Sequence, residues 1–97
     1  MKSVLAFYKF LEIEDLHELR LELLEQGASL ELKGTILIAR EGINSTLVGQ
    51  KKNLEAFSYW LTNRFGSFPF KWPLKRETPK SISKPIAKRL KIFLLPH

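Results

Sequence analysis

The residues best suited to chemistry in this chain are aromatic and basic side chains that alternate near its C-terminal end. Trp72 lies beside Lys71, and basic residues recur from there almost to the last position: Lys75, Arg76, Lys80, Lys84, Lys88, Arg89 and Lys91. Aromatic faces stack on unpaired nucleobases, while lysine and arginine neutralise phosphates. The pattern predicts a nucleic-acid-binding segment. Two alternatives stay open: each lysine is a solvated surface residue, and Phe70 and Trp72 point into the core.

The charge of the chain is distributed unevenly along its length. Residues 1–63 carry seven basic and nine acidic side chains, whereas residues 64–97 carry nine basic and one acidic, and the whole chain has a net charge of +6. A one-sided basic segment favours a polyanionic partner such as RNA. A solvated basic tail accounts for the same distribution.

Side chains for covalent or metal chemistry are scarce. The chain has no Cys, which excludes a disulfide scaffold, a thiolate nucleophile and a Cys-based zinc site. His17 and His97 are the only imidazoles, so we expect no metal and no cofactor. Acyl-phosphate hydrolysis would need an Arg in a Gly-rich loop after the first strand, but residues 10–14 are acidic and lack Gly. We therefore expect no catalytic residue within this chain.

Hydrophobic periodicity and turn residues predict the elements that must position these side chains. Asp15 is a good N-cap with Glu18 completing a capping box, and Gly27 is the expected C′ residue that closes the helix. Pro69 and Pro73 restrict the aromatic stretch at residues 68–76 to an edge strand or an irregular arm. The expected strands are 4–10, 35–39, 43–48 and 89–95, and the second helix is 51–64.

This order of elements predicts an α+β fold, the ferredoxin-like βαββαβ sandwich, with an antiparallel sheet and two helices on one face. We expect one domain over residues 1–97, with 70–97 as its basic C-terminal segment. Phe7 and Tyr8 are interpreted as core residues, because the basic-Gly-aromatic consensus of RNA-recognition motifs is absent from residues 43–48. The chain shows neither a secretory signal nor an apolar run of membrane-spanning length, so we expect a cytoplasmic protein with no membrane contact.

One block of sequence is distinctive. Residues 33–39 (KGTILIA) are followed by Glu41-Gly42-Ile43-Asn44, with Phe7-Tyr8-Lys9-Phe10 before them and Phe70-Lys71-Trp72 after them. Together these resemble the N-terminal domain of the rhodanese-type tRNA uridine hydroxylases. The resemblance implies a ferredoxin-like domain that precedes a rhodanese-like domain with the reactive Cys, in a family that hydroxylates the wobble uridine of tRNA at carbon 5.

The resemblance also implies partners, namely tRNA and a rhodanese-like domain in cis or in trans. Because this chain has no Cys, we expect it not to be catalytic alone, and whether it is part of an enzyme stays open, as does its oligomeric state. The Glu41-Gly42-Ile43-Asn44 loop is either a structural turn, with positive φ at Gly42 and Asn44 as its cap, or a contact to RNA or to the second domain. The alternative function is a stand-alone interaction or ligand-binding module that pairs through a sheet edge or the apolar residues 92–95.

Overall fold

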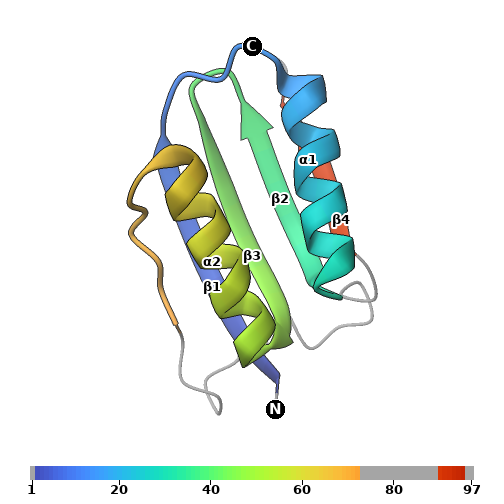
Figure 1. Ribbon diagram of the computed structural model, residues 1–97. Coiled ribbons are helices and arrows are strands. Elements are labelled where there is room, and N and C mark those ends of the chain that lie inside the picture. The colour runs from blue at the N-terminus through green and yellow to red at the C-terminus, as the bar shows by residue number, and fades with distance from the viewer. Residues whose placement is uncertain (1, 73–89, 96–97) are drawn as a thin grey trace.

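The computed structural model describes residues 2–72 and 90–95 of the chain. The elements follow in the predicted order: β1 (Lys2–Phe10), α1 (Leu16–Ser29), β2 (Lys33–Ala39), β3 (Gly42–Gln50), α2 (Lys51–Phe65) and β4 (Leu90–Leu94). The helices lie side by side on one face of the sheet, α2 over β1 and β3 and α1 over β2 and β4 (Figure 1). The predicted α+β ferredoxin-like sandwich is confirmed.

The sheet differs from the expected one in the pairing of its last strand. The strand order is β1-β3-β2-β4, and β3 is antiparallel to both neighbours, but β4 is parallel to β2. The sheet is therefore mixed and not antiparallel throughout. The physical reason is that residues 68–71 occupy the position beside β1, where Lys71 forms an antiparallel bridge with Ala6, so β4 pairs at the opposite edge.

This arm beside β1 is held by two reciprocal backbone hydrogen bonds. The Ala6 amide donates to the Lys71 carbonyl at 2.9 Å, and the Lys71 amide donates to the Ala6 carbonyl at 2.7 Å. Pro69 cannot donate to a ladder, and between β1 and residues 68–72 the pairing consists of this one bridge. Of the two predicted alternatives, an edge strand or an irregular extended arm, the structure has the irregular arm as far as Trp72, and residues 73–76 lie outside the described part.

The core lies between the sheet and the two helices. Alternate strand residues point toward the helices and are buried, and they meet the apolar stripes of α1 and α2. Leu5, Ile36, Ile38, Leu47, Leu23, Leu54, Phe57 and Leu61 are fully buried. Each such side chain stabilises the fold by about 1.5–3 kcal/mol through removal of its apolar surface from water.

The ends of α1 show one confirmed prediction and one that is wrong. Asp15 is the N-cap, and its carboxylate accepts a hydrogen bond from the Glu18 amide at 3.0 Å. The helix continues past Gly27 to Ser29, so Gly27 is not its C′ residue. Gly27 is instead a buried contact point inside the helix, because a Cβ there would overlap the Leu90 side chain of β4.

The described residues form two helices, α1 and α2. Neither of them is long and apolar enough to cross a membrane.

Candidate nucleic-acid interface

The strand residues that point away from the helices form one face of the sheet, which we call the open face. Neither helix covers this face (Figure 1). The alternation of burial and the pairing register assign to it Lys2, Val4, Ala6, Tyr8, Phe10, Lys33, Thr35, Leu37, Ala39, Gly42, Asn44, Thr46, Val48, Gln50, Lys91 and Phe93. Of these, only Val4 is buried.

One line of side chains across the open face has an aromatic ring at each end, and we call it the aromatic row. The register pairs Tyr8 with Asn44, Asn44 with Leu37, and Leu37 with Phe93. Tyr8 and Phe93 are 52% and 48% exposed. The prediction that Tyr8 is a core residue is therefore wrong, whereas Phe7, the next residue, is buried as expected. The strand alternation separates the two rings to opposite faces.

The adjacent line of side chains has lysine at both ends, and we call it the basic row. The register aligns Ala6 with Thr46, Thr46 with Thr35, and Thr35 with Lys91. Lys71 joins the row beyond Ala6, because directly paired residues on neighbouring strands share a face. Lys71 and Lys91 are both exposed. The bridge and β4 thus place two of the predicted RNA-binding residues on the same face, at opposite edges.

The open face carries positive charge with no carboxylate among its described residues. Its lysines are Lys2, Lys33, Lys71 and Lys91. The described acidic residues lie in the loop after β1, on the helices and in turns: Glu12, Glu14, Asp15, Glu18, Glu22, Glu25, Glu31, Glu41 and Glu55. A face with one sign of charge attracts a polyanion from a distance.

A hollow of about 320 Å³ opens at one end of the open face, and we call it the slot. Gly42 and Ala39 pair with each other in its lining, while Phe10 and Leu95 contribute larger side chains. Phe10 is 80% exposed, and its ring meets that of Tyr8 edge to face with centroids 6.1 Å apart. Asn44 also lines the slot, so its amide lies among apolar groups.

The Glu41-Gly42-Ile43-Asn44 loop is divided between the turn, the core and the open face. The Glu41 carbonyl accepts a hydrogen bond from the Leu11 amide at 3.1 Å, which ties the hairpin to the loop after β1. Ile43 is buried, and Asn44 is an exposed residue inside β3, so Asn44 does not cap the turn. The prediction of a positive φ at Gly42 is also wrong, since the described glycines with a positive φ are Gly34 and Gly66. Glycine at position 42 allows β3 to lie close against β1, because a Cβ there would approach the Lys9 carbonyl oxygen to 2.6 Å.

The remaining predicted site residues have mixed outcomes. Trp72 is 38% exposed at the β1 edge of the sheet, next to Lys71. Phe70 packs against the core, with its ring edge to face with Phe7 at 5.5 Å. The other predicted residues lie outside the described part: Lys75, Arg76, Lys80, Lys84, Lys88 and Arg89. Lys33, Phe10 and Phe93 were missed, because alternation within a strand separates two faces without showing which of them the helices cover.

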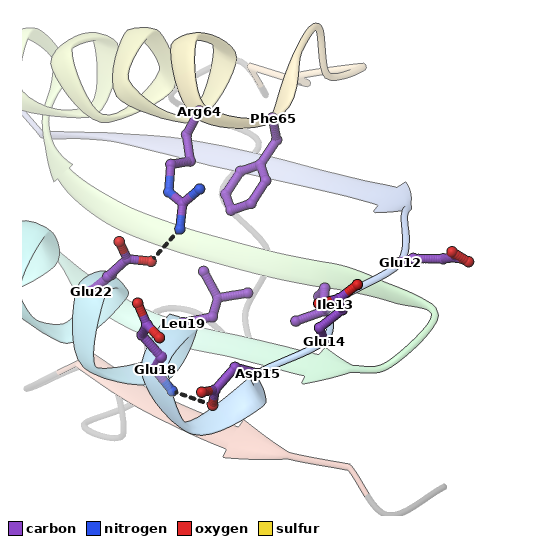
Figure 2. Close-up of a pocket in the computed structure, with 9 residues that line it drawn as sticks. All are labelled: Glu12, Ile13, Glu14, Asp15, Glu18, Leu19, Glu22, Arg64 and Phe65. Atoms are coloured by element: carbon purple, nitrogen blue, oxygen red, sulfur yellow. Dashed lines mark hydrogen bonds and ion pairs between the residues drawn. The ribbon is translucent and has the colours of Figure 1, made fainter.

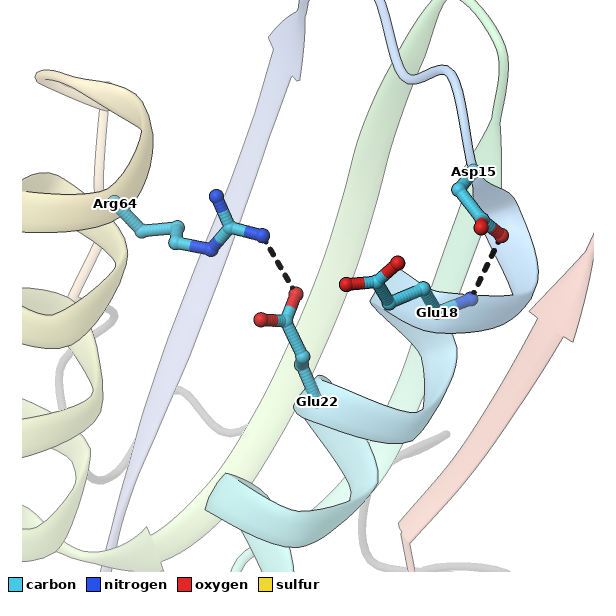
Figure 3. A network of polar contacts seen from close by, with 4 residues as sticks. All are labelled: Asp15, Glu18, Glu22 and Arg64. Atoms are coloured by element: carbon cyan, nitrogen blue, oxygen red, sulfur yellow. Dashed lines mark hydrogen bonds and ion pairs between the residues drawn. The ribbon is translucent and has the colours of Figure 1, made fainter.

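An acidic hollow lies elsewhere, where the start of α1 faces the end of α2 (Figure 2). It has a volume of about 280 Å³, and its charged lining is Glu12, Glu14, Asp15, Glu18, Glu22 and Arg64. Arg64 forms an ion pair with Glu22 at 2.7 Å, and Asp15 caps α1 (Figure 3). The excess of carboxylates disfavours a phosphate in this hollow. Within residues 2–72 and 90–95, no three Asp, Glu, His or Cys side chains are grouped as metal ligands.

Comparison with known proteins places this fold in a family. Residues 2–88 match the UPF0176 acylphosphatase-like domain, which spans most of the chain. The chain belongs to this family. It is 36% identical over 77 residues to a tRNA uridine(34) hydroxylase from Bordetella petrii, a match that covers 77% of this chain and 31% of the relative. A tRNA uridine(34) hydroxylase from Cupriavidus pinatubonensis is 44% identical over 57 residues, covering 59% of this chain and 20% of the relative.

These relatives confirm the resemblance to the N-terminal domain of the tRNA uridine hydroxylases. The chain spans about a third or less of the length of the two relatives. Among solved structures, the fold is similar to that of BlrB, a BLUF protein in its dark state, with a TM-score of 0.65 and 11% identity. That match covers 96% of this chain and 72% of BlrB, and at this identity it supports the fold alone.

Proposed function

We propose that this chain is a tRNA-binding domain of a cytoplasmic tRNA uridine hydroxylase that modifies the wobble uridine at carbon 5. The chain would not catalyse hydroxylation alone, and a rhodanese-like domain, in cis or in trans, would supply the reactive Cys. Membership of the UPF0176 family and the names of the two relatives support the proposal. The absence of Cys from this chain supports the division of roles.

The observation that carries the binding role is the composition of the open face. Four lysines share this one surface with exposed aromatic rings, and the carboxylates that border it, Glu31 and Glu41, lie outside the strands at its two ends. Phosphate neutralisation supplies most of the affinity of such a surface, and stacking favours unpaired bases. The anticodon loop of tRNA offers phosphates and unpaired bases together. Trp72, which lies next to Lys71, and the six basic residues outside the described part are proposed to contact the RNA as well.

The first test measures tRNA binding by the chain as a function of salt concentration. We expect the double variant Lys71→Gln, Lys91→Gln to bind tRNA more weakly, because two phosphate contacts are lost. The slope of log affinity against log salt should become shallower by roughly 1.5, from about 0.7–0.9 for each contact. Fluorescence anisotropy of labelled tRNA gives both quantities.

A matched control removes the same kind of charge from the helix layer. Lys52 is exposed near the start of α2, two positions before the buried Leu54 and therefore on the solvent side of the helix. Lys52→Gln should leave both the affinity and the salt slope close to those of the parent chain. Binding that is insensitive to salt, or an equal loss in Lys52→Gln, would contradict the proposal.

The alternative is a stand-alone interaction module without an RNA role. It is favoured by Phe93 and Leu95, which are 48% and 43% exposed at the β4 edge of the described sheet. Exposed apolar side chains on an edge strand are suited to pairing with a second chain. Analytical ultracentrifugation separates the two functions, because a tight homodimer that ignores tRNA would support the alternative.

A further inference from the structure

The strongest remaining feature of the molecule is the slot together with the Asn44 amide. The register places Asn44 directly between Tyr8 on β1 and Leu37 on β2. Within the described part of the chain, no residue forms a hydrogen bond with the Asn44 side chain. An exposed amide in an apolar surround has one carbonyl acceptor and two N–H donors to offer a ligand.

The volume and the lining of the slot suit a single ring-shaped ligand. Gly42 and Ala39 are the small members of its lining, and Phe10 and Leu95 come from the outer strands β1 and the end of β4. Three strand spacings separate those outer strands, or about 14 Å. A volume of about 320 Å³ lies at the low end of the range for small-molecule sites. The volume of the slot is sufficient for one base beside the Phe10 ring.

The charge around the slot indicates which kind of molecule would supply the bound base. Lys71 and Lys91 belong to the basic row, which lies next to the aromatic row that contains Asn44. A strand of RNA with its phosphates at the basic row brings its bases over the aromatic row. Glu41 at the slot is the one carboxylate in its lining, and it lies in the hairpin turn, outside the strands.

We propose that the slot binds one unpaired nucleobase of RNA, stacked on the Phe10 ring with the Tyr8 ring at its edge, and that the Asn44 amide reads the edge of this base. The inference rests on the proposed tRNA-binding function and adds to it the class of ligand, a single-stranded nucleotide, and a specificity-determining residue. Amide side chains pair with base edges through a donor and an acceptor at once. Duplex RNA is excluded from this site because its bases are paired and stacked.

The test uses the full chain and short RNA hairpins whose loop carries 2-aminopurine, a fluorescent base that is quenched on stacking. We expect quenching with the hairpin, and weaker binding of a blunt duplex of equal length. Phe10→Ala should weaken binding of the hairpin about tenfold, in line with the loss of one stacking contact. Because Phe10 is 80% exposed, this variant retains the fold, which circular dichroism verifies.

The role of Asn44 is tested with loops that differ in one base. Asn44→Ala should reduce the difference in affinity between the preferred and the other bases, while the salt slope stays that of the parent chain. Asn44→Asp retains the size but loses both donors, and should invert or abolish the same preference. Asn63 is an exposed residue of α2, and Asn63→Ala is the matched control that should change nothing.

The outcomes separate the two proposals. If Lys71→Gln and Lys91→Gln weaken binding while the Phe10 and Asn44 variants behave as the parent chain, the slot inference is overturned and the proposed function stands. Equal binding of duplex and hairpin also overturns the slot inference. If the chain binds no RNA at all, or forms a homodimer that Phe10→Ala dissociates, both proposals fail.

Discussion

Gly34 shows how a single backbone position supports the open face. It has φ of 122°, a conformation that residues with a Cβ rarely adopt, and a Cβ there would overlap the carbonyl oxygen of Thr46 on β3. Gly34 therefore allows β2 to lie close against β3 at the point where the basic row crosses both strands. The block of sequence that carries the family resemblance includes this residue, and the strand contact gives it a physical role.

We expect Gly34→Ala to lower the free energy of unfolding by about 1–3 kcal/mol, because both the strained φ and the overlap with a backbone oxygen must be relieved. Chemical denaturation followed by circular dichroism measures the change in the free energy of unfolding. Gly49→Ala is the control, since a Cβ at Gly49 meets the flexible end of Leu32 at 2.8 Å and its φ is ordinary. Equal losses in the two variants would show that the φ of Gly34 is not the cause.

At the scale of elements, Lys9 joins β1 to the end of α2. Its ammonium group donates hydrogen bonds to the carbonyl oxygens of Phe65, at 3.3 Å, and Ser67. It also lies 5.0 Å from the centroid of the Phe68 ring, where a cation–π contact adds to the attachment. A cation at a helix C-terminus satisfies carbonyls that have no partner within the helix.

We expect Lys9→Met to lower the free energy of unfolding by about 1–2 kcal/mol, because hydrogen bonds from a charged donor are lost while the apolar stem is retained. Hydrogen exchange should show faster opening of the last turn of α2 than of α1. Lys2→Met, on the same strand, is the control and should have little effect on stability. Uniform protection across both helices in Lys9→Met would contradict this role.

Most of the elements could be predicted from local patterns, whereas their pairing could not. The apolar stripe and Asp15 N-cap indicate α1, and the Gly66 turn ends α2 where the periodicity stops. The parallel pairing of β4 with β2 depends on the arm at residues 68–71 taking the other edge, which is a long-range competition that no local pattern encodes. The extension of α1 past Gly27 likewise depends on the contact with Leu90.

At the scale of the whole molecule, the open face of the sheet and the surface of α1 differ in the sign of their charged side chains. The open face has four lysines and no carboxylate among its described residues, while Glu18, Glu22 and Glu25 lie on α1. Lys71 and Lys91 could be identified from the sequence as members of a basic segment, but not as two edges of one face. Lys2 and Lys33 come from the acidic part of the chain, so only the sheet register reveals that they belong to the same surface.

The exposed aromatic rings were harder to predict for a related reason. Phe7 and Tyr8 are adjacent and both suit a buried strand, and the sequence gives no sign of which one faces the helices. Which of the two rings is buried depends on the face that the helices cover, and the packing of Leu5 and Phe7 against the core determines that face. The open face, and with it the slot, therefore emerges only when the layers are assembled.

The central claim, that RNA binds to the open face, is tested most directly by the side-chain amides of the three asparagines. Asn44 lies on the open face, whereas Asn53 and Asn63 lie on α2. A ¹⁵N-labelled chain is titrated with an anticodon stem-loop of tRNA and followed by ¹H–¹⁵N correlation spectra. The account predicts that the Asn44 amide signals shift and saturate while those of Asn63 remain in place. Shifts at Asn63 with an unchanged Asn44 would contradict it.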